Sequence, residues 1–364
     1  MQPFTNQFMS KRIAFIAPYP FSQAPSQRFR FEQYIDALRD HGFEVNEYAF
    51  LDDKGWATLY KEGSTLTKAM AMLRSFFRRF LLLFKLSGID YVFIHREASM
   101  IGPPIFEWII AKILRKKYIY DFDDAIWLPN YSETNAKFHK LKAYGKVKKI
   151  IKWADQVVVG NDHLKKYALQ FNSNVQIIPT TIDLKHTHTI TTAHTNPVVI
   201  GWTGTHTTVK YLDQIVPVLQ KLENDYTFEF RVISNQAPEF ELKSLNFVPW
   251  NKSTEIEDLA KINIGIMPME DSKWSRGKCG FKGLQYMALE IPAIMSPVGV
   301  NTEIVKDGEN GFLCDTPNEW EQTLRKLIED IPLRKEIGAR GKQTVIERYS
   351  VAANTVNYLN LFKS

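Results

Sequence analysis

Short apolar runs alternate with longer amphipathic stretches along the first half of the chain. The apolar runs are rich in β-branched and aromatic residues and end at turn residues, which is typical of buried strands. Regular alternation of strands and helices predicts parallel βαβ units in an open, doubly wound sheet. The predicted strands are 12–18, 43–48, 91–95, 117–121, 156–160 and 175–179, and the predicted helices are 27–39, 65–86, 103–114, 140–153 and 162–169.

A polar segment interrupts this alternation. Residues 186–196, HTHTITTAHTN, have no periodicity and are predicted to be a linker. A metal site at its three histidines, His186, His188 and His194, is the sharper alternative, but no Cys or carboxylate stands at zinc spacing. The pattern then restarts, so we expect a second open α/β sheet. Its predicted strands are 197–202, 227–233, 246–248, 262–267, 293–295 and 311–314, followed by a helical tail from 319.

Composition and charge narrow the class of protein. The 364 residues suit two domains, and the two cysteines are too few for a disulfide framework. Neither a signal-peptide pattern nor an apolar run of ~18 residues is present, so we expect a cytoplasmic protein. The net charge of +6 favours nucleic acid, anionic lipid or phosphorylated ligands as partners. Because no nucleic-acid-reading module is recognisable, we do not expect nucleic acid to be the partner.

A glycine-rich turn before a predicted helix is the strongest sign of ligand chemistry. Glycines within 277–283 let the backbone approach a ligand at a helix N-terminus, where free N–H groups and the helix dipole favour phosphate. Arg276, Lys278 and Lys282 surround this turn, and the two lysines, four residues apart, would share a helix face. We predict that these cations bind a diphosphate. A solvated basic turn is the alternative.

A second glycine-rich turn, GWTGTHTT at 201–208, follows the first strand after the linker. Nucleotide-binding folds place phosphate at such strand-to-helix turns. Hydroxyls and amides of Thr203 and Thr205, with Gly204 between them, are available to bind phosphate oxygens. The run is neither GxGxxG nor a Walker motif, and a structural cap on the next helix explains it equally well.

Three carboxylates end a predicted strand of the first domain, in the run YDFDD at 120–124. Strand alternation puts Asp121 and Asp123 on one side. Ligands of open α/β sheets bind at the carboxyl ends of strands, and two such sheets facing each other predict a cleft at these ends. We expect Asp123 and Asp124 to face this cleft. A divalent-metal Asp-x-Asp pair at 121 and 123 and acids that cap the following segment are the alternatives.

Basic residues follow two further strands of the first domain. His95 and Arg96, in the run IHRE, would reach the cleft, although an internal arginine–glutamate pair fits the same residues. Arg28 and Arg30, in the run SQRFR, stand at the first strand-to-helix turn. There they would bind a phosphate or begin a surface helix.

Several motifs resemble retaining glycosyltransferase family 4, the glycosyl transferases group 1 of GT-B fold. The donor-site signature of that family is similar to QYMALEIPAIMSPVG at 285–299, followed by Glu303 and by DGENGF at 307–312. The segments IPTTID at 178–183 and WTGT at 202–205 extend the resemblance over the chain.

The resemblance implies a domain organisation. We expect an α/β chain of GT-B fold, with two Rossmann-like, doubly wound parallel-sheet domains facing across a cleft and a C-terminal helix that crosses back to the first domain. The implied parts are an acceptor domain at 1–185, the linker at 186–196, a nucleotide-sugar donor domain at 197–345 and the crossing helix at 346–364.

The resemblance also implies an activity. A hexosyltransferase of this kind moves a sugar from a nucleotide diphosphate sugar to a saccharide or lipid-linked acceptor, with retention and without a metal or other cofactor, in cell-surface polysaccharide or glycan synthesis. The implied site residues are catalytic Asp123 and Asp124; nucleotide and diphosphate ligands Thr203, Gly204, Thr205, Arg276, Lys278, Lys282, Gln285 and Glu303; donor-sugar neighbours Gly277, Cys279 and Gly280; and acceptor ligands Arg28, Arg30, His95 and Arg96.

This chain departs from the family's pattern at three places. Gln285 replaces the glutamate that holds the donor ribose, although an amide still bonds a hydroxyl. The family's other glutamate falls on Gly277, and the usual Arg–Lys pair after the first strand of the second domain is missing, with only Lys210 nearby. We infer that the cations at 276–282 neutralise the diphosphate. The alternative is a catalytically inactive nucleotide-sugar-binding or scaffold protein.

One predicted helix mixes bulky apolar and basic residues, MLRSFFRRFLLLFK at 72–85. Such helices can lie on anionic membranes, and more basic residues follow at 115–117 and between 140 and 152. We therefore expect peripheral binding to the inner face of a membrane. A core helix whose arginines extend to solvent is the alternative.

Overall fold

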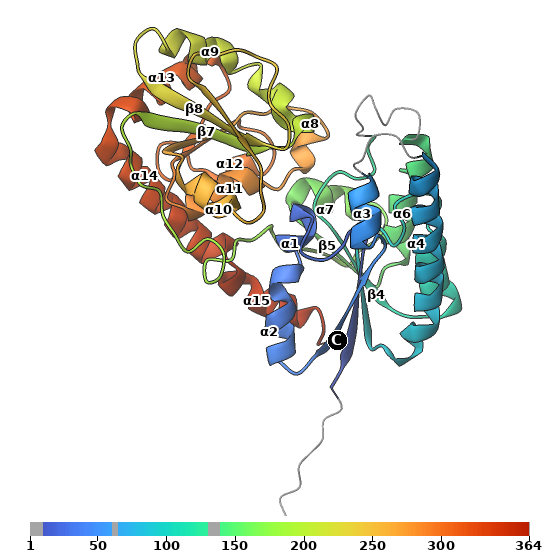
Figure 1. The fold of residues 1–364 in the computed structure, drawn as a ribbon. Coiled ribbons are helices and arrows are strands. Elements are labelled where there is room, and N and C mark those ends of the chain that lie inside the picture. The colour runs from blue at the N-terminus through green and yellow to red at the C-terminus, as the bar shows by residue number, and fades with distance from the viewer. Residues whose placement is uncertain (1–9, 60–64, 130–138, 364) are drawn as a thin grey trace, which may run out of the picture. The chain divides into compact units, whose positions relative to one another are not determined.

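Two parallel β-sheets, each with its own helices, make up the protein (Figure 1). The computed structural model describes residues 10–59, 65–129 and 139–363. The chain divides into a first unit, Met1–Ile178 with Thr355–Ser364, and a second unit, Pro179–Asn354. The predicted α/β class with two doubly wound parallel sheets is confirmed.

The sheet of the first unit has the strand order β2-β1-β3-β4-β5-β6. The chain runs outward from β1 to β2 in one direction and from β3 to β6 in the other, so right-handed crossovers place helices on both faces. The central strand β4 is buried along its whole length, as a strand covered on both sides should be. The strands are β1 (Arg12–Ala17), β2 (Glu44–Ala49), β3 (Tyr91–His95), β4 (Tyr118–Phe122), β5 (Gln156–Val159) and β6 (Val175–Ile177).

Helices from both ends of the chain cover this sheet. Tyr358 of the last helix stacks on Tyr34 with ring centroids 4.2 Å apart, and Phe362 packs against Phe15 and Phe93. The last residues therefore belong to the core of the first unit. The helices are α1 (Pro25–Arg28), α2 (Ile35–Asp40), α3 (Asp53–Leu59), α4 (Thr65–Lys85), α5 (Ile105–Trp108) with a π-helical turn at Ile109–Ile113, α6 (Lys146–Trp153), α7 (Asp162–Ala168) and α15 (Val351–Asn360).

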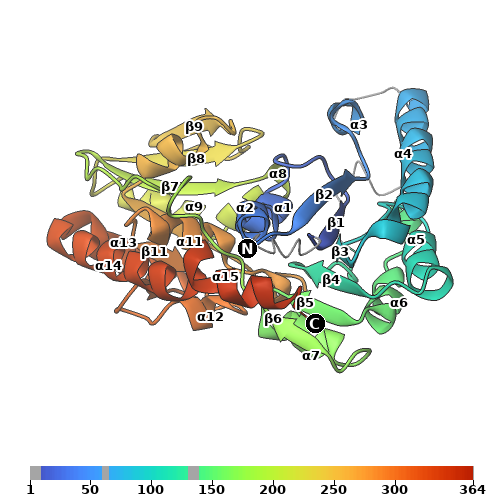
Figure 2. The same ribbon diagram turned by 90° about the horizontal axis from the view of Figure 1, so that it is seen from below.

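The second sheet has the order β12-β11-β10-β7-β8-β9, so β7 and β10 are its central strands. Strands β7, β8 and β9 lie side by side in Figure 2. Trp202 and Trp320 are the largest side chains in its core. The strands are β7 (Val198–Gly204), β8 (Phe228–Ser234), β9 (Leu245–Pro249), β10 (Ile264–Met267), β11 (Ala293–Met295) and β12 (Phe312–Leu313). The helices are α8 (His206–Val209), α9 (Val216–Leu222), α10 (Glu255–Ala260), α11 (Phe281–Ala288), α12 (Asn301–Ile304), α13 (Pro317–Glu329) and α14 (Ile331–Thr344).

Two predicted helices have different bounds. The helix predicted at 27–39 is divided into α1, a 3-10 turn at Glu32–Tyr34 and α2. The side chain of Gln27 in α1 bonds both the amide and the carbonyl of Tyr19. The helix predicted from residue 140 begins only at Lys146, because Ala143 takes a left-handed φ of 51° that a helix cannot contain.

The predicted linker is tied to the second sheet. Thr192 donates to the carbonyl of Ile262 at 2.6 Å, and the Asn263 side chain bonds the carbonyl of Ala193 and the amide of Val199. A fully buried asparagine thus satisfies the backbone of this segment. Over the described residues, no three His, Cys, Asp or Glu side chains are grouped to hold a metal ion, at the linker or elsewhere.

The arginines of α4 point in opposite directions. Arg79 is buried and donates to the carbonyls of Ala98, Tyr48 and Ala17 at 2.8 to 3.0 Å, so it joins the helix to the ends of three neighbouring segments. Burial lowers the pKa of Arg79 to about 9. Arg74, in contrast, lies in solvent.

No helix of the described ranges is long and apolar enough to cross a bilayer.

Removal of the buried guanidinium should destabilise the protein. Arg79→Ala leaves three buried carbonyls without their donor, so we expect the free energy of unfolding to fall by about 3 kcal/mol in urea titrations. Arg74→Ala, on the solvent side of the same helix, is the matched control and should change it by less than about 0.5 kcal/mol. Equal effects of the two substitutions would contradict the assigned role of Arg79.

Candidate functional site

The carboxyl ends of β7 and β10 lie next to each other at the centre of the second sheet, where the strand order reverses direction. Ligands of open α/β sheets bind at such a switch point. The predicted phosphate ligands at 203–205 are the last two residues of β7 and the one that follows, and the cationic turn at 275–282 comes after β10. The topology therefore brings the two predicted phosphate-binding turns to the same edge of one sheet.

The cationic turn is held close to the loop that follows β11. Gly299 has a φ of 56°, and a Cβ at this position would lie 2.9 Å from the carbonyl oxygen of Arg276. Gly280 has a φ of 67° and is the N-cap of α11, where a Cβ would overlap Ile304. Both glycines are therefore required by the backbone. Helix α11 begins at Phe281, directly after the part of the cationic turn that contacts this loop.

Each cation of the turn already has a partner within the second unit. Arg276 forms a two-point ion pair with Asp271, with N–O distances of 2.6 and 2.7 Å. The ammonium of Lys278 lies 5.0 Å from the ring centre of Trp274, and that of Lys282 lies 5.4 Å from the ring centre of Trp202. The aromatic faces attract these ammonium groups and limit their movement. Asp271 offsets the charge of Arg276, so the two lysines supply most of the net positive charge.

The turn after β7 is partly committed to internal contacts. The amide of Thr203 donates to the hydroxyl of Tyr286, and a Cβ on Gly204 would overlap the Trp202 ring. Thr205 is the N-cap residue of α8, the role that the structural alternative assigns to it. Of the three predicted phosphate ligands in this turn, Thr205 is the most exposed.

The remaining predicted donor residues differ in burial. Gln285 is 1% exposed, and its Nε2 has no hydrogen-bond partner among the described residues. Gly277 and Cys279 are buried in the same turn. Glu303 is exposed on α12, and its backbone carbonyl accepts from Arg348.

Two polar residues that sequence reasoning missed lie at the same strand ends. The Oδ1 of buried Asn301 has no partner in the described part of the chain and is 3.4 Å from where a Cβ of Gly280 would be. The hydroxyl of Ser234, at the end of β8, is likewise unpartnered in the described ranges. A buried polar atom without a partner costs about 1 to 3 kcal/mol, so such atoms indicate a ligand site. Ser234, the polar last residue of an otherwise apolar strand, gave a signal in the sequence, whereas Asn301 in α12 gave none.

One arginine holds both predicted catalytic carboxylates of the first unit. Arg96 donates to Asp123 through Nε at 2.7 Å and to Asp124 through Nη2 at 2.8 Å. Burial alone would lower the pKa of Arg96, but the two carboxylates raise it above its ordinary value. Arg96 thus orients the carboxylates, and Glu97 pairs with Lys146 at 2.9 Å instead of with Arg96. The internal Arg96–Glu97 pair considered from the sequence is wrong.

Two of the predicted acceptor ligands lie in the interior. Arg30 and His95 are nearly inaccessible, and both bind the buried carboxylate of Asp121, His95 through Nδ1 at 2.6 Å. This position corrects the prediction that they contact an acceptor directly. Asp121 is also committed to these partners, which removes it from an Asp-x-Asp metal pair with Asp123. Arg28 is half-buried, with its guanidinium 5.0 Å from the Phe29 ring centre.

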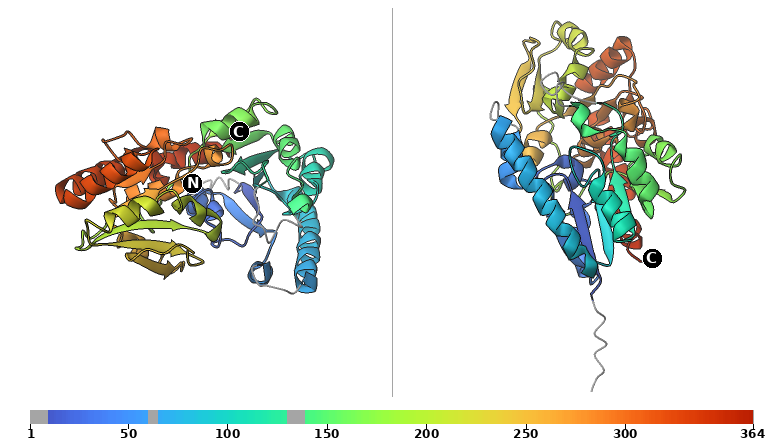
Figure 3. Two further views of the ribbon diagram at one scale, coloured as in Figure 1. Left: turned by 90° about the horizontal axis from the view of Figure 1, so that it is seen from above. Right: turned by 90° about the vertical axis from the view of Figure 1, so that its right-hand side faces the viewer.

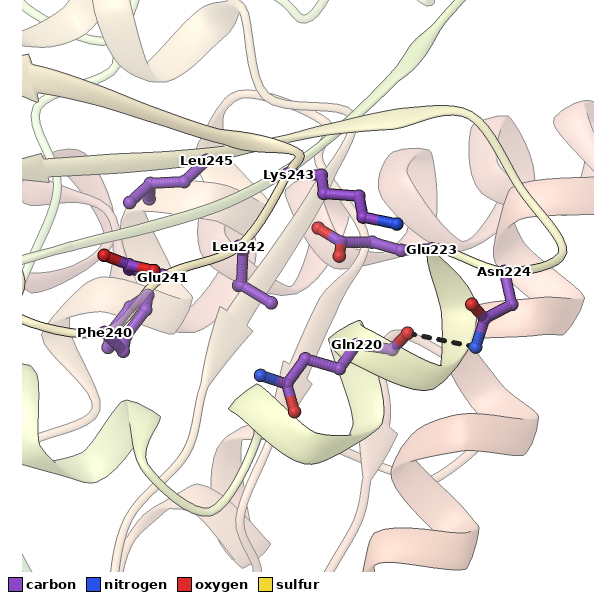
Figure 4. Close-up of a pocket in the computed structure, with 8 residues that line it drawn as sticks. All are labelled: Gln220, Glu223, Asn224, Phe240, Glu241, Leu242, Lys243 and Leu245. Carbon is purple, nitrogen blue, oxygen red and sulfur yellow. Dashed lines mark hydrogen bonds between the residues drawn. The ribbon is translucent and has the colours of Figure 1, made fainter.

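A separate pocket of about 640 Å³ in the second unit contains none of the predicted site residues (Figure 4). It lies beside the end of α9 and the loop that enters β9, which is the amino edge of the sheet. Glu223 accepts from the amide and hydroxyl of Ser244 there, so it fixes the loop. Its lining residues are Gln220, Glu223, Asn224, Phe240, Glu241, Leu242, Lys243 and Leu245.

Comparison with known families finds a match within the second unit. Residues 189–344 match the family model of glycosyl transferases group 1. This segment is a glycosyl transferases group 1 domain. It contains both glycine-rich turns, Gln285, Asn301 and Glu303, whereas the Asp121 network and the Arg96 fork lie outside it.

One protein of similar sequence and two proteins of similar structure can be compared with this chain. The uncharacterized glycosyltransferase MJ1178 of Methanocaldococcus jannaschii is 30% identical over 142 residues, which are 35% of this chain and 38% of that protein. Sucrose-phosphate synthase of Thermosynechococcus elongatus has a similar structure, with a TM-score of 0.72, 14% identity and coverage of 97% of this chain and 98% of that one. Anabaena HepE in complex with UDP and glucose has a TM-score of 0.62, 13% identity and coverage of 98% and 100%. The predicted GT-B fold is confirmed, while the matched segment spans well under half of the curated relative.

The buried network of the first unit should make stability depend on pH in a defined way. Burial raises the pKa of Asp121, but Arg30 and His95 outweigh it and hold the pKa below its ordinary value of 3.8. The carboxylate therefore stabilises the fold above pH 3.8, and this contribution is lost as the pH falls through the lower, folded-state pKa. We expect Asp121→Asn to lower the free energy of unfolding by about 3 kcal/mol at pH 7. Urea titrations between pH 7 and pH 3 should show that the difference in the free energy of unfolding between the variant and wild type becomes smaller only below pH 3.8. A gap that closes at higher pH would contradict the assignment.

Proposed function

We propose that this chain is a glycosyltransferase that moves a sugar from a nucleotide diphosphate sugar to a saccharide or lipid-linked acceptor. The observation that carries the proposal is the turn at 275–282, where two lysines, a helix N-terminus and unpartnered buried polar atoms meet at the switch point of a group 1 domain. The structural relative HepE binds UDP and glucose. A nucleotide diphosphate has the negative charge and the polar groups that such a turn would bind.

In this proposal the second unit holds the donor. Lys278 and Lys282 contact the diphosphate, and the amides at the start of α11 donate hydrogen bonds to its oxygens. Gln285 binds the ribose hydroxyls through the amide that lacks a partner among the described residues. Gly277, Cys279 and Gly280 leave room for the donor sugar beside the helix start. These groups would stabilise the leaving diphosphate without a metal ion.

The first unit contributes carboxylates to the transfer. The bond between the anomeric carbon and the diphosphate oxygen breaks, and the acceptor oxygen forms a new bond to the same carbon. We propose that this occurs with retention and that the departing diphosphate oxygen takes the acceptor proton. Asp123 and Asp124, fixed by Arg96, would then bind sugar hydroxyls as hydrogen-bond acceptors.

The setting of the reaction is also part of the proposal. A lipid-linked acceptor requires the enzyme to work at a membrane, and we propose peripheral attachment to the inner face in cell-surface polysaccharide or glycan synthesis. The basic character of the first unit, with lysines along α6, supports an anionic surface as partner.

A nucleotide-sugar-binding protein without transferase activity is the second candidate. It is favoured by Gly277 and Gln285, which stand where the family has glutamates. Purified protein and a panel of UDP-, GDP- and ADP-sugars would separate the two. Transfer to water or to an acceptor supports the enzyme, whereas a thermal shift without turnover supports the binding protein.

The lysines of the turn should determine the affinity for the diphosphate. We expect Lys278→Ala and Lys282→Ala each to raise the Kd for UDP roughly 10-fold, about 1.4 kcal/mol, in isothermal titration. Lys326→Ala is the matched control, because its ammonium also lies over a ring, that of Phe312 at 5.7 Å, but on the distant helix α13. Unchanged affinity in both turn variants would refute the donor site.

The carboxylates should affect turnover and not donor binding. Asp123→Asn and Asp124→Asn each remove a charge that Arg96 holds in place, so we expect kcat to fall roughly 100-fold. The Kd for UDP should stay within about twofold, because the donor ligands belong to another unit. Asp155→Asn, an exposed carboxylate paired with Lys117, serves as the control and should leave kcat unchanged. Normal turnover in both Asp123 and Asp124 variants would remove them from the mechanism.

A further inference from the structure

Helix α4 lies on the outside of the first unit (Figure 3), and one of its faces exposes a stripe of apolar side chains. A surface helix ordinarily turns its apolar side to the core, and α4 does so through Leu82 and Leu83. A second set of apolar residues, spaced three or four positions apart, faces solvent instead and is 44% to 75% exposed. This set, called the α4 stripe, is Leu66, Met70, Leu73, Phe77, Phe80, Leu81 and Phe84.

The neighbouring helix extends the apolar surface. The rings of Phe76 and Phe106 stack at 6.0 Å, so α5 packs beside α4. Ile105 and Trp108 of α5 and Ile113 of the following turn are 44% to 58% exposed. Large apolar patches are uncommon on proteins that act alone in solution, so this surface is expected to contact a partner.

Positive charge accompanies the α4 stripe along one flank. At about 100° per residue, Arg74, Arg78 and Lys85 lie roughly a quarter to a third of a turn from the middle of the stripe. Helix α4 contains no Asp or Glu. Asp52 lies 3.4 Å from both arginines, but exposed pairs at this distance contribute little.

A small cavity joins the charged flank to the apolar stripe. It has a volume of about 230 Å³ and lies between α4 and the edge strand β2. Arg78, Lys85 and Leu81 line it, with Glu47 as its acidic member. Glu47 is already paired with Arg39, which leaves the lining positive in balance.

We propose that this face is the membrane-docking surface, with the α4 stripe in the interfacial layer of an anionic bilayer and the basic flank on lipid phosphates. The combination of bulky apolar residues with arginine and lysine on one flank suits such a surface. A second copy of the chain is a poorer occupant. Two symmetry-related α4 helices would bring basic flanks together, and α4 carries no acidic residue to pair with them.

This proposal rests on the proposed function, because it names the surface through which the protein binds the membrane. Vesicle sedimentation tests membrane binding without a measurement of turnover. We expect the wild-type chain to bind vesicles of phosphatidylcholine with phosphatidylglycerol more than 10-fold better than vesicles of phosphatidylcholine alone. The double variant Phe77→Ser with Phe84→Ser should bind them more than 10-fold more weakly. The variant Arg74→Ala with Arg78→Ala should lose most of the dependence on salt and on phosphatidylglycerol.

Controls keep the test independent of folding and of the donor site. Leu169→Ser removes a similarly exposed apolar residue at the C-cap of α7, and this variant should bind vesicles like wild type. All variants should keep the wild-type thermal midpoint and affinity for UDP. Absence of binding to anionic vesicles by folded wild type would overturn the proposal, as would a dimer that the Phe77→Ser and Phe84→Ser changes dissociate. Either result would leave the donor site standing.

Discussion

The buried charge of Asp121 is the interaction on which the first unit depends. Its carboxylate joins three segments, because Arg30 reaches it from the turn after α1 and His95 from the end of β3. A buried carboxylate without these partners would cost several kcal/mol, so none of the three segments can move alone. The network also fixes the residues that follow. Arg96 comes directly after His95, and the carboxylates that it binds come two and three residues after Asp121.

The second unit depends on a different constraint, the close packing of two loops. Its core brings the turn after β10 so close to the loop after β11 that glycine is needed at the contact. The same packing leaves Gln285 Nε2 and Asn301 Oδ1 buried without partners in the described part of the chain. Natural proteins keep such costs mainly where function requires them. A ligand that supplies hydroxyls and phosphate oxygens would satisfy these groups and the two lysines together.

Periodicity in the sequence was enough to predict both sheets, because a buried strand and an amphipathic helix each have a characteristic spacing. Glycines among lysines were enough to single out the cationic turn. The sequence did not reveal that Arg30 and His95 bind Asp121, since these partners stand 91 and 26 positions away along the chain. For the same reason Arg96 was assigned to an acceptor, although it holds Asp123 and Asp124. The helix predicted at 27–39 is divided into shorter helical segments, a break that its periodicity did not indicate.

The central claim is that a nucleoside diphosphate binds at the turn where α11 begins. Hydrogen–deuterium exchange of the full chain, with and without saturating UDP, GDP or ADP, measures this directly because ligand contact slows the opening of local structure. The account predicts that one of the three slows exchange within residues 275–285 and 298–303 and leaves the amino edge of the second sheet unchanged. Protection confined to other parts of the chain, in the presence of a nucleotide that demonstrably binds, would contradict it.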